Sequence, residues 1–225
     1  NNYGMGLAEQ LAAKALKKYP RDEYVIATKG SWPIGDSVYH KGLSRKHILW
    51  AIEGSLAKMQ LDYVDIYYAH RYDPETGMEE IVRTFNFLIN SGKIRYWATS
   101  EWPASAIKEC HKVCEKLGLE KPIIEQCLYS FAVQKATTNG VADYCREQNI
   151  GILAFSPLCQ GYLTGKYRHG IPQDSRVAKS EKILYDKTSN FYNQNKDIID
   201  HFLDICEQYN YNSGQIALLW CIRNK

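Results

Sequence analysis

The chain has 225 residues, of which 45% are hydrophobic and 24% are charged. This composition is typical of a folded globular protein, and it excludes disordered, collagenous and membrane-spanning classes. Basic and acidic residues nearly balance, giving a net charge of +3 with the two signs interleaved along the chain. Because no stretch has a single sign, we expect a small-molecule partner and neither nucleic acid nor a membrane.

The cysteines and the apolar runs bear on the cellular compartment. Seven cysteines are scattered without C-x-x-C spacing, which argues against a disulfide framework and predicts reduced thiols. The longest apolar run, 216–222, is far shorter than a membrane span, and the first residues carry no signal pattern. The sequence therefore predicts a cytoplasmic protein, and its length favours a single domain over 1–225.

Five short runs rich in β-branched and aromatic residues predict strands. In chain order they cover residues 24–29, 63–70, 94–100, 122–128 and 151–156. The last run is almost continuously apolar, which is expected for a strand that is buried on both faces.

Amphipathic stretches with cap residues alternate with these strands and predict helices. They cover 45–59 after Ser44, 78–90 after Pro74 and Thr76, 104–117 between Pro103 and Gly118 and, after the last strand, 197–210 and 213–223. The alternation at βαβ spacing predicts a parallel sheet with right-handed crossovers. The polar stretch 168–195 is too long for a simple connection and is interpreted as a functional loop.

Counting strands alone leaves two α/β architectures open. Five strands suffice for an open doubly wound sheet, whereas a closed (β/α)8 barrel needs more. The only glycine-rich turn suited to the open sheet is Gly4-Met5-Gly6 before a helix from Leu7, and Glu9 stands where the third glycine of a dinucleotide motif belongs. We therefore do not expect this turn to hold a dinucleotide.

Polar residues stand at the carboxyl ends of the predicted strands. They are Lys29, His70, Thr99 with Ser100, Gln126, and Ser156 with Pro157. In parallel α/β folds these ends meet at one rim, so the set predicts a single pocket. Taken individually, Ser100 and Gln126 are equally well explained as polar residues that end a strand.

Several motifs together carry a family resemblance. They are 2–9 (NYGMGLAE), 27–29 (ATK), 42–48 (GLSRKHI), 69–74 (AHRYDP), 155–158 (FSPL) with 165–167 (GKY), and 215–220 (QIALLW). Over essentially its whole length the chain resembles the aldo-keto reductase superfamily, and within it the branch that contains the β-subunits of voltage-gated potassium channels. The resemblance implies a (β/α)8 TIM barrel that binds NADPH without a Rossmann fold and reduces carbonyls to alcohols.

The same resemblance implies that the barrel is truncated at both ends. About five barrel strands are present, and about two strands before Asn1, one after Lys225 and the segment that grips the adenosine 2′-phosphate are expected outside this sequence. We therefore expect 1–225 to be a single incomplete domain, and a chain that is inactive as it stands is a third possibility beside the enzyme and the regulatory subunit.

The family's catalytic tetrad of Asp, Tyr, Lys and His maps onto Tyr3, Lys29 and His70, with the aspartate expected upstream of Asn1. Hydride addition to a carbonyl builds negative charge on oxygen, so the site needs a proton donor beside a cationic or hydrogen-bonding group. An ammonium within about 4–6 Å lowers the pKa of a phenol, which is the role implied for Lys29 beside Tyr3. His70 would orient the carbonyl.

For the cofactor, the family pattern implies a nicotinamide amide against Ser100 and Gln126 and a stacking ring at Phe155. It also implies phosphate contacts from Ser156, Leu158, Lys166 and Arg176 and a cofactor-binding position at Pro157, although Lys166 and Arg176 are also explained as solvated loop charges. Trp32 and Trp102 are expected to line the substrate pocket, with core tryptophans as the alternative. Glu101 stands where the channel β-subunits carry an arginine.

Cys110, His111 and Cys114 lack the additional ligands that a zinc site needs, so no metal is expected.

The alternative to an enzyme is a regulatory subunit that binds nucleotide with little turnover, with a channel-like partner or a second copy of the chain. Because the channel β-subunits carry asparagine at the position of His70, this residue favours the enzyme.

Overall fold

The computed structural model describes residues 3–179 and 182–223, with side chains for all of these except 182–191. The chain forms two compact units. Unit 1 comprises residues 1–127 and 139–153, and unit 2 comprises 128–138 and 154–225. The expectation of a single domain over 1–225 stays a prediction.

The sheet contains the five strands that the sequence predicts. They are β1 (Ala27–Gly30), β2 (Val64–Ala69), β3 (Ile94–Ser100), β4 (Ile124–Leu128) and β5 (Gly151–Phe155), in the order β1-β2-β3-β4-β5. The pairs β1–β2, β2–β3 and β3–β4 are parallel. The predicted parallel α/β class is therefore confirmed.

The register of the sheet aligns the carboxyl ends of neighbouring strands. Lys29 pairs with Tyr68, and Gly30, the last residue of β1, pairs with Ala69. His70, which follows Ala69, therefore lies just past the end of β1. Ser100 pairs with Gln126 in the same way between β3 and β4. Because parallel strands run in one direction, residues distant in the sequence meet at this edge.

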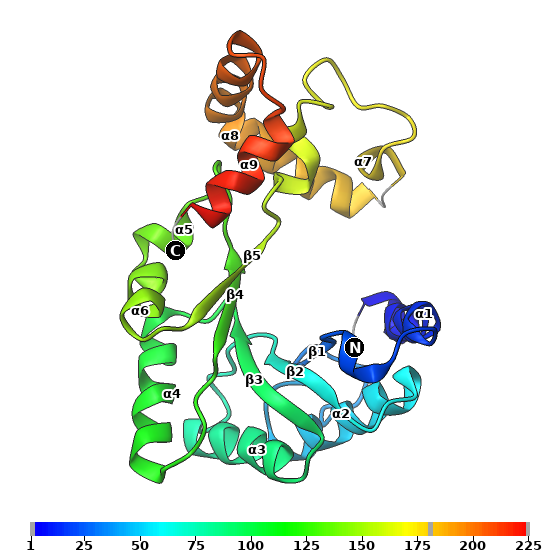
Figure 1. Ribbon diagram of the computed structural model, residues 1–225, viewed down its shortest axis with the longest axis vertical. Coiled ribbons are helices and arrows are strands. Elements are labelled where there is room, and N and C mark those ends of the chain that lie inside the picture. The colour runs from blue at the N-terminus through cyan, green and yellow to red at the C-terminus, as the bar shows by residue number, and fades with distance from the viewer. Residues whose placement is uncertain (1–2, 180–181, 224–225) are drawn as a thin grey trace. The chain divides into compact units, whose positions relative to one another are not determined.

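Helices of unit 1 surround the sheet (Figure 1). The described elements are η1 (Tyr3–Gly6), α1 (Leu7–Leu16), η2 (Arg21–Glu23), α2 (Arg45–Met59), α3 (Met78–Asn90), α4 (Ala104–Leu117) and α6 (Val141–Glu147). The predicted ranges for α2, α3 and α4 are confirmed, because local signals set their ends. The Ser44 hydroxyl accepts a hydrogen bond from the His47 amide, and Gly118 ends α4 in a left-handed conformation.

The start of α3 differs in detail from the expectation. Gly77 directly precedes α3 and provides no side-chain cap. The Thr76 hydroxyl instead donates to the Asp73 carboxylate at 2.7 Å, and the same carboxylate accepts from the Leu43 amide at 2.7 Å. Asp73 thus ties the segment after β2 to the segment before α2.

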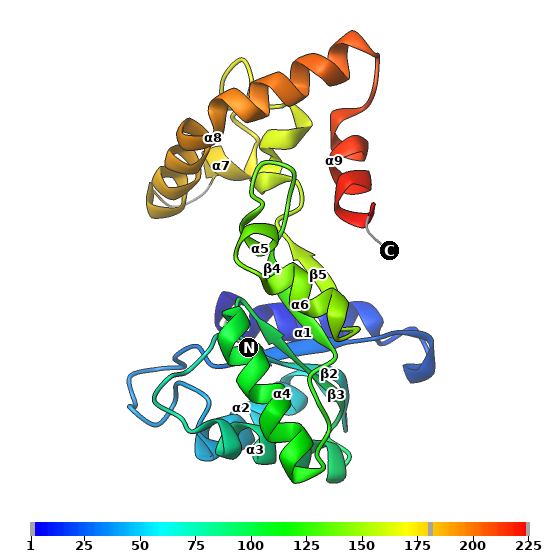
Figure 2. The same cartoon turned by 90° about the vertical axis from the view of Figure 1, so that its left-hand side faces the viewer.

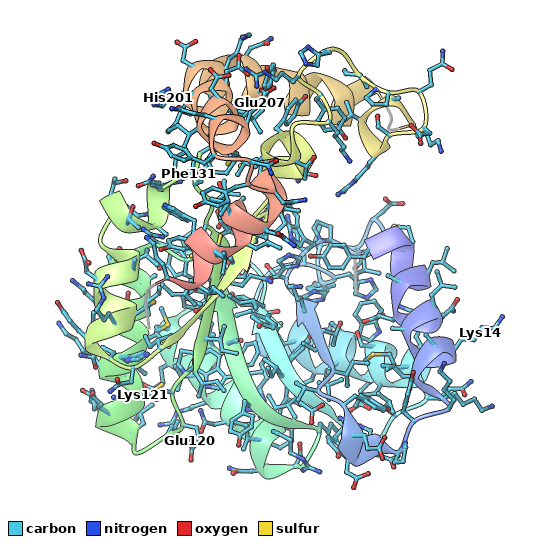
Figure 3. The ribbon with its side chains drawn as sticks, turned by 45° about the horizontal axis from the view of Figure 1, so that its top comes forward. Lys14, Glu120, Lys121, Phe131, His201 and Glu207 are labelled. Atoms are coloured by element: carbon cyan, nitrogen blue, oxygen red, sulfur yellow. The ribbon has the colours of Figure 1, made fainter. Side chains whose placement is uncertain are left out.

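The core of unit 1 is built from large rings on β2, β3 and α3. Tyr67 contacts Phe85, and Phe85 stacks on Trp97 with ring centroids 4.8 Å apart, all three being fully buried. The Trp97 indole donates to the carbonyl of Glu120 at 3.0 Å, and the side-chain oxygen of Asn86 accepts from the Glu120 amide at 2.8 Å. Glu120, labelled in Figure 3, therefore links β3 and α3 to the segment before β4.

Unit 2 is mainly helical, with α9 packed on α8 (Figure 2). Its elements are α5 (Lys135–Thr138), η3 (Cys159–Thr164), α7 (Arg176–Lys179), α8 (Lys182–Gln208) and α9 (Ser213–Ile222). Phe131, labelled in Figure 3, contacts Phe202 of α8 at 4.6 Å between ring centroids. Tyr162 of η3 stacks on Tyr192 of α8 at 4.5 Å.

Two expectations about this half of the chain are wrong. The stretch 168–195 is not one long loop, since it contains α7 and the first part of α8, and the predicted helix 197–210 is the last part of α8. A polar helix needs only a narrow apolar stripe to pack, here seen at Tyr192 against Tyr162.

Strand β5 is not buried on both faces, because Ile152 is 38% and Leu153 45% exposed. Apolar composition alone does not specify what covers a strand that stands last in the sheet order.

All seven cysteines have free thiols in the structure. No helix within 3–179 or 182–223 combines the length and apolar character that crossing a membrane requires.

Candidate active site

The three residues expected to be catalytic come together in unit 1. Tyr3 lies in η1, Lys29 in β1, and His70 directly after β2. The Tyr3 hydroxyl is 3.5 Å from Nε2 of His70, and the ammonium of Lys29 lies 5.1 Å from the centroid of the Tyr3 ring. A phenol, an ammonium and an imidazole thus share one small cluster.

A glycine turn shapes the segment that carries Tyr3. Gly4 and Gly6 have φ of 56° and 92°, in the left-handed region that glycine adopts without strain. A Cβ at Gly6 would lie 2.9 Å from the side chain of Lys58 on α2. The turn therefore needs glycine at position 6 both for its backbone conformation and for the close approach of Lys58.

A buried carboxylate fastens α1 to β1. The Thr28 hydroxyl donates to Oε1 of Glu9 at 2.7 Å, and the Lys58 ammonium is 3.8 Å from Oε2. Glu9 is 7% and Thr28 5% exposed. Because Thr28 precedes Lys29, this contact holds the helix that follows Tyr3 against the strand that carries Lys29. This role of Glu9 was not predicted from the sequence. The only signal for it was that an acidic residue stands inside 2–9, one of the motifs that carry the family resemblance.

His70 is held in its neutral form. Burial lowers its pKa to about 3, and the neighbouring cations Arg71 and Lys29 act in the same direction. Its Nδ1 atom is buried without a hydrogen-bond partner among the described residues. A neutral imidazole is a poor source of protons near pH 7, so Tyr3 is the group in the cluster suited to donate a proton.

Trp32 and Arg71 are further neighbours of His70. Trp32, which is 40% exposed, meets the His70 ring edge-on at 6.0 Å between centroids. The guanidinium carbon of Arg71 lies 5.4 Å from the Trp32 ring centroid, and Nη1 donates to the His70 carbonyl and, at 3.3 Å, to the Ser100 hydroxyl. The sequence analysis gave Arg71 no role, although its position directly after a strand-ending histidine was a signal.

The residues expected to hold nicotinamide lie next to each other on β3 and β4. Ser100 is 3% exposed, Gln126 is half-buried, and the two residues pair in register. The Glu101 amide donates to the Gln126 carbonyl at 3.0 Å. A hydroxyl and a carboxamide at one sheet edge provide donors and acceptors that suit the amide of a nicotinamide.

Trp102, expected to line the substrate pocket, is only 2% exposed. Its indole donates to the Ala69 carbonyl at 3.2 Å, and its ring meets Tyr72 edge-on. This tryptophan is therefore hydrogen-bonded to the last residue of β2, directly before His70.

A second buried carboxyl, missed by the sequence analysis, lies beneath this loop. Glu125 on β4 is fully buried, and its Oε1 accepts from the Trp102 amide at 3.3 Å. Burial raises its pKa to about 7, although bonds from Thr99 and the amides of Trp102 and Glu101 oppose the shift. A single acidic residue inside the predicted strand 122–128 was the signal in the sequence.

The remaining cofactor candidates lie in unit 2. Phe155 is 44% exposed, and the hydroxyl of Ser156, a residue with φ of 53°, accepts from the Gln160 amide group at 2.9 Å. Pro157 and Leu158 are half-buried and lead into η3. An exposed ring followed by a tight polar turn fits the stacking and phosphate contacts expected of this segment.

The two basic candidates differ in their surroundings. Lys166 is exposed yet folded against the η3 turn, since a Cβ at Gly161, where φ is 101°, would lie 2.7 Å from its side chain. Arg176 is exposed at the first position of α7. A lysine next to a glycine turn is the type of group that binds phosphate.

A metal centre is not found in the part of the chain that the structure describes. Cys110, His111 and Cys114 are buried on α4, and no group of three or more metal-ligating side chains is found within residues 3–179 and 182–223.

Comparisons with known proteins show the family of the chain. A sequence model of the aldo/keto reductase family matches residues 1–225. A protein of Arabidopsis thaliana named as a probable voltage-gated potassium channel subunit beta is 38% identical over 234 residues, which cover 99% of this chain and 68% of that protein. A protein of the same name from Oryza sativa subsp. japonica is 36% identical over 233 residues, with the same two coverages.

The chain spans about two thirds of the length of these relatives. The full-length family match and the parallel strand–helix alternation confirm the barrel fold class, of which the structure describes five strands. The chain belongs to the aldo/keto reductase family.

Proposed function

We propose that this chain carries the catalytic centre of an NADPH-dependent reductase that converts aldehydes and ketones to alcohols. The observation that carries the proposal is the distance of 3.5 Å between the Tyr3 hydroxyl and Nε2 of His70, with the Lys29 ammonium 5.1 Å from the Tyr3 ring. Three groups from separate segments thus surround the space that a carbonyl oxygen would occupy.

Each residue has one role in this mechanism. Tyr3 donates a proton to the carbonyl oxygen, and Lys29 stabilises the phenolate that remains. His70, kept neutral by burial and by its cationic neighbours, offers a hydrogen bond from Nε2 that orients the carbonyl. With the proton on Nε2, Nδ1 carries only a lone pair and does not need an acceptor, although it finds no donor among the described residues.

Members of this family generally use NAD(P)H. When bound, the reduced nicotinamide supplies the hydride that adds to the carbonyl carbon. Ser100 and Gln126 in unit 1 would hold its amide. For Phe155, Ser156, Pro157, Leu158, Lys166 and Arg176 of unit 2, the cofactor contacts stay what the family resemblance implies. We further propose a cytoplasmic location, in keeping with the free thiols.

A regulatory role is the second candidate. The relatives named as channel β-subunits support it, and under it the chain would bind NADPH and a channel-like partner or a second copy with little turnover. His70 supports the enzyme, because the structure brings its imidazole to the Tyr3 hydroxyl.

The test uses the full-length protein with NADPH and 4-nitrobenzaldehyde, followed by the loss of reduced-nicotinamide absorbance. We expect turnover that Tyr3→Phe lowers by about 100-fold or more, because general acid catalysis contributes about 10²–10⁴, while NADPH binding is retained. Tyr19→Phe, a change at another exposed tyrosine, is the matched control. Tight NADPH binding without turnover would favour the regulatory role.

A further inference from the structure

Arg71 stands out because its charge is uncompensated. It lies at the carboxyl edge of the sheet, directly after His70, and its side chain is half-buried. Among the side chains that the structure describes, no carboxylate forms an ion pair with it, whereas Arg21 and Lys58 of the same unit both have acidic partners. A half-buried guanidinium without a counter-charge is costly unless a ligand supplies the anion.

The contacts of Arg71 hold its guanidinium in place and leave donors unused. Nη1 donates to the His70 carbonyl and to the Ser100 hydroxyl, and the guanidinium lies over the ring of Trp32. A guanidinium has five N–H donors, and these two bonds both come from Nη1. Neither Nε nor Nη2 forms a hydrogen bond with a described residue, and neither is among the buried atoms without a partner, so both are in contact with solvent. They are therefore accessible to a planar, bidentate acceptor.

The position relative to the proposed proton donor sets where such an acceptor would sit. Trp32 contacts both groups: its ring centroid lies 6.0 Å from that of His70 and 5.4 Å from the guanidinium carbon of Arg71, so one exposed ring neighbours the imidazole and the guanidinium. A flat substrate whose carbonyl meets Tyr3 and His70 would pass along the exposed Trp32 ring and end at Arg71.

We infer that Arg71 forms an anion subsite for the substrate, and that the preferred substrates are carbonyl compounds that carry a carboxylate at the end opposite the carbonyl. This inference rests on the proposed function and adds the substrate class to it. Its basis is the uncompensated guanidinium, its fixed orientation on Trp32 and its place beside His70. The same charge could also attract a phosphate of the cofactor, and the experiment separates the two sources.

The main experiment compares 4-formylbenzoate with 4-formylbenzamide, which has the same shape without the charge. With the full-length protein and saturating NADPH, we expect kcat/KM to be about tenfold or more higher for the carboxylate, since a charge-assisted bidentate bond supplies more than the 1.4 kcal/mol that a factor of ten requires. Added salt should reduce this ratio.

The variants assign the preference to one side chain. Arg71→Met should abolish the preference, and Arg71→Lys should keep part of it, because lysine retains the charge but not the bidentate geometry. Arg95→Met is the matched control, since Arg95 is an exposed arginine on β3 that contacts Tyr63, and it should keep the wild-type ratio. Thermal melts of each variant check that the fold is retained.

A binding measurement separates this inference from the proposed function. Benzoate should bind the full-length protein in the presence of NADP⁺, and Arg71→Met should remove that binding whether or not the protein turns over. Turnover of both aldehydes without preference would overturn the anion subsite alone. A preference that survives in Arg71→Met, or a loss confined to NADPH affinity, would also overturn it, the latter by assigning Arg71 to the cofactor.

Discussion

The Thr28 hydroxyl donates a buried hydrogen bond of 2.7 Å to the carboxylate of Glu9. Through this bond the helix that follows Tyr3 is fastened to the strand that carries Lys29, so the proposed proton donor and its cationic neighbour share one support. The geometry of the site therefore depends on a residue that does not touch it.

This relationship predicts the behaviour of Glu9 variants. Glu9→Ala removes the buried acceptor of the 2.7 Å Thr28 bond and the ion-pair partner of Lys58, so we expect a loss of about 1–3 kcal/mol in the free energy of unfolding. Thr28→Val combined with Glu9→Ala should be less than additive in a double-mutant cycle measured by denaturant titration. The exposed Glu79→Ala, which removes a surface pair with Arg83, is the control. Additive losses would show that the two residues are not coupled.

The low pKa of His70 predicts a pH dependence of stability. The pKa is about 3 in the folded chain against 6.5 for the free side chain, so between these values the unfolded chain binds more protons than the folded one. The contribution is therefore complete above pH 6.5 and is lost as the pH falls toward 3. In His70→Asn the stability should fall less steeply over this range, as measured by thermal melts. His47, whose pKa burial lowers to about 4, supplies part of the slope that remains.

A surface histidine provides the comparison. His201 on α8, labelled in Figure 3, is exposed, and His201→Asn should leave the acid limb of the stability curve unchanged. An acid limb equally steep in His70→Asn and in the wild type would contradict the neutral, buried imidazole.

Glu125 predicts the opposite trend. Its folded-state pKa of about 7 lies above the ordinary value of 4.5, so between these values the folded chain binds more protons and its stability decreases as the pH rises. Glu125→Gln stays neutral at every pH and can still accept the Trp102 bond. Its stability relative to the wild type should therefore increase between pH 4.5 and 7.5 in denaturant titrations. The exposed Glu53→Gln should show no such increase, and a constant difference across this range would refute the shift.

The close contact between Gly30 and Tyr67 predicts a rescue. A Cβ at Gly30 would lie 2.2 Å from the Tyr67 hydroxyl, which is buried without a partner among the described residues. We expect Gly30→Ala to lose about 1–3 kcal/mol in the free energy of unfolding, and Tyr67→Phe in the same chain to restore most of it. Gly54→Ala meets open space within α2 and should gain about 0.5–1 kcal/mol. Failure of Tyr67→Phe to restore stability would place the strain elsewhere in β1.

The chain's own sequence was sufficient for the elements whose ends are set by neighbouring residues. Ser44 and Gly118 fix the ends of α2 and α4 through bonds and conformations a few residues long, so these boundaries could be predicted. The strand order and the meeting of Lys29 with His70 follow from the alternation of strands and helices, which leaves a parallel sheet as the simplest solution.

Only the tertiary structure decided which charges are compensated and which groups are buried. Three features each depend on residues or solvent exposure that a local pattern does not specify: the bond from Thr28 to Glu9, the raised pKa of Glu125, and the guanidinium of Arg71, which has no ion-pair partner among the described residues. The exposure of β5 was also decided by the tertiary structure, because the amino-acid composition of an apolar strand does not indicate whether a neighbouring element covers it. Hydrogen-bond caps act over a few residues, whereas burial and electrostatic interactions depend on the folded surroundings.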